Sequence, residues 1–391
     1  MRLLHLHSSA DLYGSDRSLL RTVQAGVAHG YSSVVVLPHR GPLVEELESA
    51  GAHVLIRPIA VLRRKDLGIL RLPWFLMRML VGEALLLPLV WRADVVHINT
   101  SAVVNGSIAC ILTGRPLVQH VREILNHPEW LARLHARWTS LGASRIIAVS
   151  EETRRNLVVF GVEQSRIKVL HNGIDTERFK PGPEDRVKAR RDLHVPTPNG
   201  TIVVVCVGRL HPWKGQDWLV EAIGRLSSAQ RLPKNSVIFL VGGVVPGNEQ
   251  VEKNLRSRVR ALGLEKTVCF RGEMSDIRPI LWAADIAVVP STKPDPLPTT
   301  VLEAMSAALP VVASAAGGAL EMVVDQSTGL LVDMGSVEQL ADALESLMDN
   351  PDLRRKMGDA GQARARQCFA FKRYAEEWLG LIETAGERRT G

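Results

Sequence analysis

The sequence predicts an α/β fold made of two Rossmann-like domains, and three observations lead to this prediction. Short apolar runs alternate with longer amphipathic stretches along the chain. The alternation starts again after a loop rich in proline and charge at 181–198. The chain has 391 residues, 46% hydrophobic and 23% charged, which is enough for two domains that each have their own core.

The expected strands are continuous apolar runs, because both faces of a parallel sheet are covered by helices. In the first half we expect strands at 3–6, 33–37, 54–56, 95–98, 117–120 and 145–149, and in the second half at 202–207, 237–241, 268–271, 286–289 and 311–313. An aromatic helical stretch closes the chain. We therefore predict three segments, namely an N-terminal acceptor-binding domain at 1–175, a C-terminal donor-binding domain at 176–368, and a helix at 369–391 that crosses back to the first domain.

Composition excludes several classes of protein. The four cysteines include no CxxC pair and no cluster at zinc spacing, so neither a disulfide framework nor a structural metal is expected. The N-terminus lacks the apolar stretch of a signal peptide. The apolar region 68–91 is interrupted by charges and prolines, and we do not expect it to span a membrane. No G-x-G-x-x-G follows the first strand and no P-loop is present, which argues against dinucleotide oxidoreductases and P-loop NTPases.

The net charge lies in the first half of the chain. Residues 1–170 carry 20 basic and 13 acidic side chains, whereas residues 171–391 carry 28 of each. Many of these cations are arginines near apolar helices, as expected for a surface that meets anionic lipid headgroups or a phosphorylated acceptor. A solvated basic face is the alternative. No nucleic-acid motif accompanies the charge, and no nucleic-acid partner is expected. The scattered cysteines and the missing signal-peptide stretch predict a cytoplasmic protein, and the basic surface predicts that it is peripheral on the inner face of the membrane.

The densest chemical signal lies at 290–305 and continues at 310–321. A strand runs into a proline-rich loop, and a helix begins near Pro298 or Thr299. The first amides of a helix have no intrahelical partner and form a ready anion site. We expect the free amides to be those of Thr299, Thr300 and Val301.

Charged side chains surround this expected anion site. Asp295 and Glu303 are eight residues apart and could flank a ligand by accepting hydrogen bonds from its hydroxyls. In the loop 207–216, Gly208 allows a close turn, and Arg209 and Lys214 can reach over one pocket. Two cations beside a helix N-terminus suit a diphosphate.

The motifs of the C-terminal half resemble those of glycosyltransferase family 4. They are the paired acids at 295 and 303, the glycine- and lysine-bearing loop at 208–215, the segment Asn172 to Asp175, and the run 310–321 with its two glycines. The resemblance implies the GT-B fold, in which two Rossmann-like domains face each other across a cleft. It also implies a retaining transferase that needs no metal ion and no cofactor besides its nucleotide-sugar donor.

The resemblance assigns roles to individual residues. Arg209 and Lys214 would bind the donor diphosphate, Glu303 the ribose and Asp295 the sugar hydroxyls. Together with His120, the two cations and Asp295 form the implied catalytic group. The implied donor-binding residues are Gly14, Ser15, Gly208, Arg209, Lys214, Asp295, Pro298, Thr299, Thr300, Val301, Glu303, Gly317 and Gly318.

Two departures from the family pattern affect the donor site. The first acidic position is Asp295 instead of glutamate, which shortens its reach by one methylene. Leu297 and Pro298 replace a common Phe-Gly pair, which removes one backbone donor and stiffens the loop. Both changes bear on the choice of sugar.

The N-terminal half carries weaker signals. Gly14 and Ser15 follow the first strand and would face the donor phosphates, although an ordinary helix start capped by Ser15 or Asp16 is the alternative. His120 ends a strand and resembles the segment with the family's active-site histidine, where a neutral imidazole could hydrogen-bond the reacting sugar.

The other histidines are expected to be structural. His97 is interpreted as a structural residue at the edge of the sheet, and His5 and His7 as inward-facing packing residues.

The implied function is transfer of a hexose from a nucleotide-diphosphate sugar to a glycan or lipid-linked acceptor, in the assembly of cell-surface polysaccharide or glycolipid. Three alternatives remain open. They are a non-catalytic, transferase-like partner subunit, a disaccharide phosphorylase and a sugar-nucleotide epimerase on the same fold.

Overall fold

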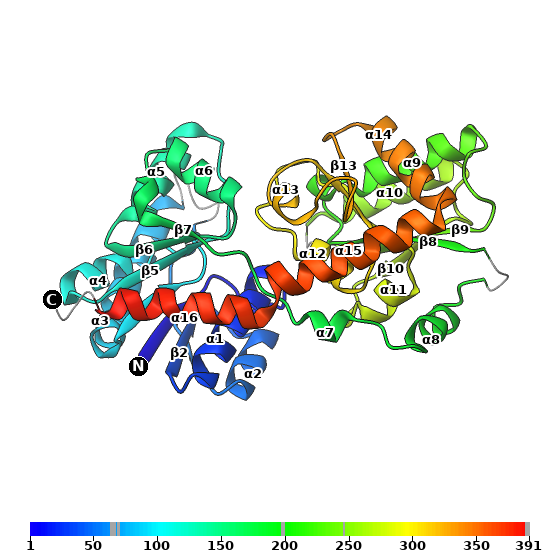
Figure 1. Ribbon diagram of the computed structural model, residues 1–391. Coiled ribbons are helices and arrows are strands. Elements are labelled where there is room, and N and C mark those ends of the chain that lie inside the picture. The colour runs from blue at the N-terminus through cyan, green and yellow to red at the C-terminus, as the bar shows by residue number, and fades with distance from the viewer. Residues whose placement is uncertain (63–67, 69–70, 197–199, 245–246, 388–391) are drawn as a thin grey trace. The chain divides into compact units, whose positions relative to one another are not determined.

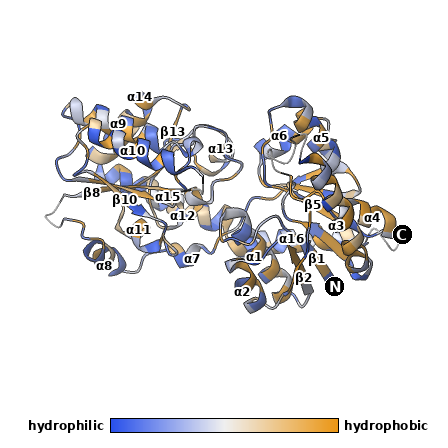
Figure 2. Ribbon diagram, turned by 180° about the vertical axis from the view of Figure 1, so that it is seen from behind, coloured by the Kyte–Doolittle hydropathy of each residue, from blue (hydrophilic) through white to orange (hydrophobic). Residues whose placement is uncertain are grey.

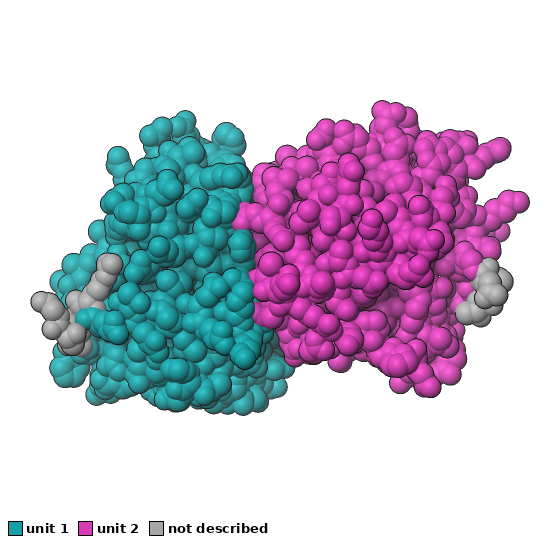
Figure 3. Space-filling view, viewed as in Figure 1, with its two compact units in different colours: residues 1–173, 371–391 teal, residues 174–370 magenta. Residues whose placement is uncertain are grey.

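The computed structural model describes residues 1–62, 68, 71–196, 200–244 and 247–387. The chain divides into two compact units (Figures 1 and 3). Unit 1 contains Met1–Gly173 and Phe371–Gly391, and unit 2 contains Ile174–Ala370. Each unit has one parallel sheet with helices on it, which confirms the predicted α/β class.

Unit 1 is built on seven parallel strands in the order β3-β2-β1-β4-β5-β6-β7. The strands are β1 (Arg2–Leu6), β2 (Ser32–Leu37), β3 (His53–Ile56), β4 (Val95–Ile98), β5 (Leu117–Val121), β6 (Ala143–Ala148) and β7 (Ile167–Val169). The helices are α1 (Gly14–Ala28), α2 (Pro42–Ser49), α3 (Leu72–Arg92), α4 (Ser107–Thr113), α5 (Glu129–Ser140), α6 (Glu151–Val159), the 3-10 turn η2 (Gln164–Arg166) and α16 (Phe371–Glu387). The sequence missed β7, because three residues with an exposed Lys168 in the middle form no apolar run.

Unit 2 is built on six parallel strands in the order β10-β9-β8-β11-β12-β13. The strands are β8 (Ile202–Val207), β9 (Ser236–Val241), β10 (Val268–Gly272), β11 (Ile286–Val289), β12 (Val311–Ser314) and β13 (Gly329–Val332). The helices are α7 (Thr176–Phe179), α8 (Asp185–Asp192), η3 (Pro212–Lys214), α9 (Gln216–Ser228), α10 (Glu249–Ala261), α11 (Arg278–Ala283), α12 (Thr299–Ser306), α13 (Ala319–Met322), α14 (Val337–Asp349) and α15 (Pro351–Phe369). The sequence missed β13 at the sheet edge.

A helix also lies inside the segment that was expected to be a loop. Helix α8 is almost entirely polar, so it carries no apolar periodicity to reveal it. Two arginines hold it to unit 2 instead. Arg186 and Arg190 each donate to the carboxylate of Asp285 at 2.6 Å.

Strand order places a switch point in each sheet. In unit 1 the strands after β1 are added on one side of it (β2, β3), and the strands from β4 onward are added on its other side. The strand order reverses in the same way between β8 and β11 of unit 2. Ligands of open α/β sheets bind outside the carboxyl ends of the strands at such points. The candidate residues after these four strands therefore lie where the topology favours a binding site.

The last helix completes the core of unit 1. Tyr374 and Trp378 of α16 are buried, with 1% and 0% of their surface exposed. They pack with Leu3, Val95 and Val118 from three strands of the sheet. The chain therefore leaves unit 1 after residue 173 and returns at residue 371 to finish its core.

Candidate functional site

The loops after β8 and β11 bring a predicted cation and a predicted acid together in unit 2. Lys214 Nζ lies 2.6 Å from Asp295 Oδ2. The ammonium also lies 4.4 Å from the centre of the Trp213 ring. The sequence analysis assigned Lys214 to the diphosphate of the donor and Asp295 to its sugar hydroxyls, whereas here the two side chains form one ion pair. An anionic ligand that binds Lys214 competes with Asp295 for it.

Two glycines fix the loop that carries this acid. A Cβ on Gly317, whose φ is +59°, would lie 2.2 Å from the Asp295 carbonyl oxygen. The Gly318 amide donates to that same oxygen at 2.8 Å. Only glycine fits so close to a neighbouring backbone. The predicted turn at 317–318 therefore does lie against Asp295.

The cation loop is fixed in the same way. A Cβ on Gly215, with φ of +71°, would lie 1.8 Å from the carbonyl oxygen of Pro290. The Thr292 amide donates to Trp213 O at 2.9 Å. These contacts join the loop after β8 to the loop after β11, so Lys214 is presented on a rigid base.

Gly208 was expected to allow a close turn, but the closest backbone approach in this loop does not lie at Gly208. A Cβ there would make only ordinary contacts, 3.8 Å from the Lys214 side chain and 3.9 Å from Gln216 Nε2. The close approach falls on Gly242, where a Cβ would lie 2.1 Å from Gly208 O. Gln216, which the sequence analysis missed, donates to Gly208 O at 3.2 Å and to Arg209 O at 3.0 Å. This buried amide positions the backbone that carries Arg209.

Helix α12 begins at Thr299 with Pro298 as its N-cap, as expected. The Val301 amide is not free, however, because it donates to Pro298 O at 3.0 Å. The expectation of three open amides is therefore wrong for Val301. It holds geometrically only for Thr299 and Thr300, which have no carbonyl one turn earlier in the helix. Glu303 lies one turn further on and is 7% exposed.

Two serines at the carboxyl ends of strands complete this half of the site. Ser291 follows β11 and Ser314 ends β12, and both are buried. Among the described residues, neither hydroxyl has a hydrogen-bond partner. A buried polar group without a partner is costly, and a ligand hydroxyl or phosphate would satisfy it. The sequence analysis missed both serines, although their position directly after apolar runs was the available signal.

Unit 1 contains a buried cluster of histidines on neighbouring strands. His5, His97 and His120 come from β1, β4 and β5, and each is 0% exposed. His5 Nδ1 lies 3.1 Å from His97 Nδ1. Burial lowers the pKa of His5 to about 3. It also lowers the pKa of His97 and His120 well below 6.5, and the nearby Arg122 guanidinium lowers both further. All three rings are therefore neutral at pH 7.

Arg122, which the sequence analysis missed, organises this cluster. Its guanidinium donates to Asn99 O at 2.9 Å and to Asn172 Oδ1 at 2.6 Å. Its Nη2 lies 3.1 Å from His120 Nδ1. Arginine has no acceptor, so His120 Nδ1 accepts this hydrogen bond and the ring proton is on Nε2. The signal in the sequence was its position two residues after His120, directly after the end of β5.

His120, which the resemblance assigns to a hydrogen bond with the reacting sugar, is fully buried. Its Nε2 is buried and has no partner among the residues that the structure describes. The side chain therefore holds Arg122 and keeps an N–H available for donation, but it does not face solvent here.

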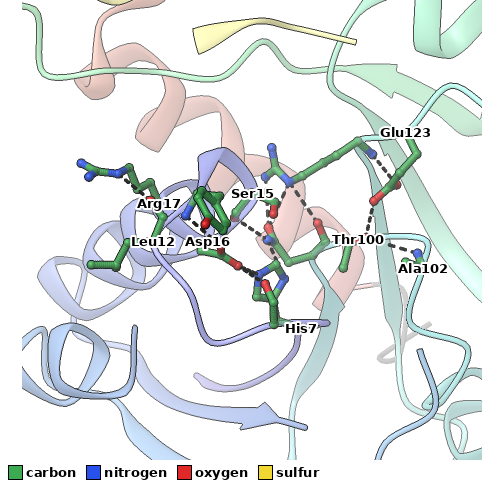
Figure 4. A network of polar contacts seen from close by, with 12 residues as sticks. His7, Leu12, Ser15, Asp16, Arg17, Thr100, Ala102 and Glu123 are labelled. Atoms are coloured by element: carbon green, nitrogen blue, oxygen red, sulfur yellow. Dashed lines mark hydrogen bonds and ion pairs between the residues drawn. The ribbon is translucent and has the colours of Figure 1, made fainter. Parts of the chain in front are cut away.

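The start of α1 is held by a second polar network (Figure 4). Asp16 accepts from His7 Nε2 at 2.7 Å and from the Tyr13 amide at 2.9 Å. Burial raises the pKa of Asp16, but the hydrogen bonds from His7, Ser9 and Tyr13 outweigh it, so its net pKa is lowered. The predicted alternative, a helix start capped by Asp16, is present in this structure. Gly14 is exposed at the first position of the helix.

His7 and Glu123 fix the neighbouring strand ends. His7 Nδ1 lies 3.2 Å from Asn99 Nδ2, so His7 is a hydrogen-bonded residue and not simply a packing residue. The Glu123 carboxylate accepts from the amide and hydroxyl of Ser101 and from the hydroxyl of Thr100. Figure 4 shows the side chains of Thr100 and Glu123 pointing toward one another. Among the described residues, no group of three His, Cys, Asp or Glu side chains is placed to hold a metal ion.

Comparison with known families gives two matches that together span most of the chain. Residues 190–364 match the family described as Glycosyl transferases group 1. Residues 13–178 match the family described as Glycosyltransferase Family 4.

Individual relatives fall into the same group. The chain is 34% identical over 251 residues to a D-inositol 3-phosphate glycosyltransferase of Kribbella flavida, covering 63% of this chain and 57% of that protein. It is 33% identical over 315 residues to an alpha-maltose-1-phosphate synthase of Mycolicibacterium smegmatis, covering 74% and 78%. The chain thus spans little more than half of the first of these relatives.

Solved structures share the fold over the full chain. The Anabaena protein Alr3699/HepE, crystallised with UDP-glucose, is 27% identical, has a TM-score of 0.84, and covers 98% of this chain and 100% of its own. WaaG, a glycosyltransferase involved in lipopolysaccharide biosynthesis, has a TM-score of 0.74 at 18% identity, which bears on the fold alone. These similarities confirm the predicted GT-B fold.

Proposed function

Because this chain belongs to the group 1 glycosyl transferases, we propose that it moves a sugar from a nucleotide-diphosphate sugar to a hydroxyl of a glycan or lipid-linked acceptor. The observation that carries the proposal is the Lys214 to Asp295 pair, which is held by close glycine contacts at the carboxyl edge of the unit 2 sheet. The similarity to HepE, crystallised with UDP-glucose, supports a uridine-diphosphate donor.

The chemistry of the donor half follows from its charges. Departure of the nucleotide leaves negative charge on the diphosphate, and the transition state is stabilised by groups that already point at that charge. We assign this role to Arg209, Lys214 and the N-terminus of α12. When the diphosphate takes Lys214, the Asp295 carboxylate is released to accept hydrogen bonds from the sugar. We assign to the hydroxyls of Ser291 and Ser314 the role of donating hydrogen bonds to the remaining oxygens of the nucleotide sugar.

The first test is a panel of UDP-, GDP- and ADP-glucose measured by calorimetry and thermal shift. We expect UDP-glucose to bind at least about tenfold more tightly than the other two, a difference of about 1.4 kcal/mol. Arg209→Ala is expected to weaken that binding by at least about tenfold, because a charge-assisted contact to phosphate is lost. Arg191→Ala, an exposed arginine on α8, serves as the matched control.

A folded protein that binds none of the three donors would contradict the proposal. It would favour the alternative of a non-catalytic partner subunit. Equal binding by Arg209→Ala and wild type would remove Arg209 from the site.

We further propose that the anomeric configuration of the sugar is retained without a metal ion. The acceptor hydroxyl would form its bond to the anomeric carbon as the bond to the diphosphate oxygen breaks, and the departing oxygen would take the proton from the same face. Proton NMR of the first product formed from UDP-α-glucose in the presence of EDTA tests this. An α-linked product is expected, and a β-linked product or a loss of activity would contradict it.

A further inference from the structure

Helix α3 exposes an apolar surface that unit 1 does not cover. Trp74, Leu80 and Trp91 are 66%, 64% and 63% exposed. Met77 and Leu85 add to the same exposed surface at 46% and 43%. Figure 2 shows the ribbon of α3 coloured as hydrophobic along most of its length. Exposed apolar surface on this scale marks a binding face, because isolated exposed side chains would not follow one helix.

The opposite side of α3 is firmly part of unit 1. Leu86 and Val90 are fully buried in its core. The buried Glu83 carboxylate accepts from the amides of Gly106 at 2.8 Å and Ala109 at 3.0 Å, at the start of α4. A Cβ on Gly82 would lie 2.8 Å from Asn105 Oδ1, so the helix touches the loop before α4 closely.

These contacts distinguish a helix that spans a bilayer from a helix that lies in its interface. By length and composition alone, α3 could cross a membrane, since its 21 residues span about 31 Å. Crossing would remove Glu83 from both backbone donors and leave a carboxylate in hydrocarbon, which is costly. A helix that keeps one side packed on its own domain can instead lie flat in the interface.

The charges on α3 identify the kind of surface. Its only acidic residue, Glu83, is buried, whereas Arg71, Arg78 and Arg92 are exposed before, within and at the end of the helix. Tryptophans lie near both ends, and tryptophan prefers the headgroup level of a bilayer. Arginines beside an apolar face favour anionic headgroups. Three further basic residues, Arg63, Arg64 and Lys65, lie outside the described residues and do not enter this argument.

We propose that α3 docks on an anionic lipid bilayer, with Trp74, Leu80 and Trp91 inserted at the boundary between headgroups and acyl chains. The exposed Ile111 and Leu112 of the adjoining α4 extend the apolar area. This docking places unit 1 at a membrane surface. It does not rest on the proposed transferase activity, because it needs neither donor nor acceptor.

The test is flotation of the full chain with vesicles of phosphatidylcholine containing phosphatidylglycerol. Wild type is expected to float with the vesicles. The triple variant Trp74→Gln, Leu80→Gln, Trp91→Gln should lower the partition coefficient at least about tenfold, because three apolar side chains no longer insert. The matched control is Val159→Gln with Val187→Gln, two valines that are each 72% exposed on α6 and α8. The control should float like wild type.

A charge variant separates the electrostatic contribution to lipid binding from the contribution of apolar insertion. Arg71→Ser with Arg92→Ser should lose most of its binding to anionic vesicles, and the remainder should no longer depend strongly on salt. Circular dichroism and melting temperature verify that each variant is folded.

The proposal is overturned if folded wild type stays with the lipid-free fraction, or if the triple variant floats as well as wild type. It is also overturned if light scattering shows a wild-type dimer that the triple variant does not form and neither protein floats. In that case the apolar face would be covered by a second copy of the chain. None of these outcomes bears on donor binding, which is measured without lipid.

Discussion

Replacement of Lys214 by alanine is expected to lower kcat/KM for the preferred donor by about 10²–10³-fold, the usual cost of losing one preorganised donor to developing negative charge. The reason is geometric as well as electrostatic. Lys214 is held at 2.6 Å from Asp295 on a loop that close glycine contacts keep rigid. Steady-state kinetics with the donor identified in the binding panel measure the effect.

Two further variants make this result specific. Lys293→Ala removes an exposed lysine from the loop that carries Asp295, and it should change kcat/KM by less than about threefold. Asp295→Asn keeps the shape but removes the charge that pairs with Lys214. We expect it to raise KM for the donor, because the sugar loses an ionised acceptor. Equal kinetics for Lys214→Ala and Lys293→Ala would show that Lys214 does not act on the donor.

Mild acid is expected to destabilise unit 1 by several kcal/mol. The pKa of His5 is lowered to about 3, and those of His97 and His120 are lowered well below 6.5. The unfolded chain therefore binds more protons than the folded one below pH 6.5. The stabilisation is fully present above that pH and is lost as the pH falls toward the folded pKa values. Each histidine that stays neutral costs about 2 kcal/mol at pH 5.

Urea-dependent hydrogen exchange at pH 7.5 and pH 5 measures this loss, because it follows the strands of unit 1 separately from those of unit 2. His5→Leu should reduce the change between the two pH values by about 2 kcal/mol, since one of the three linked protons is gone. His39→Gln, at an exposed histidine, is the matched control. The interpretation fails if unit 1 is equally stable at both pH values, or if His5→Leu and His39→Gln respond alike.

The fold could be predicted because the signals that determine it are local. Buried parallel strands are apolar throughout, so 11 of the 13 strands in the described part of the chain appeared as continuous runs. The missed strands β7 and β13 lie at sheet edges. Lys168 interrupts the apolar run of β7, and β13 is only four residues long. Helix α8 was missed because ion pairs to Asp285 hold it, and partners almost a hundred residues away leave no mark on the local sequence.

The candidate site was predicted in part. Motif spacing identified Lys214, Asp295 and the glycine turn, but not that the two charges pair with each other. The partners of Arg122 could not be found in this way. Arg122, Asn99 and Asn172 meet only after three separate segments fold together. Trp378, which comes from the far end of the chain, likewise packs against the rings of His5 and His97, and no local pattern reveals that contact.

The position of α16 has a consequence for the order in which this chain is synthesised. Domains generally fold as they leave the ribosome, N-terminal first. Unit 1 begins the chain but takes Tyr374 and Trp378 from its last helix. Unit 1 is therefore begun before unit 2 and completed only after all of unit 2 has emerged. Until then the strand residues that cover those two aromatic rings, Leu3 and Val95 among them, remain open to solvent, and a nascent chain would need protection from aggregation during that interval.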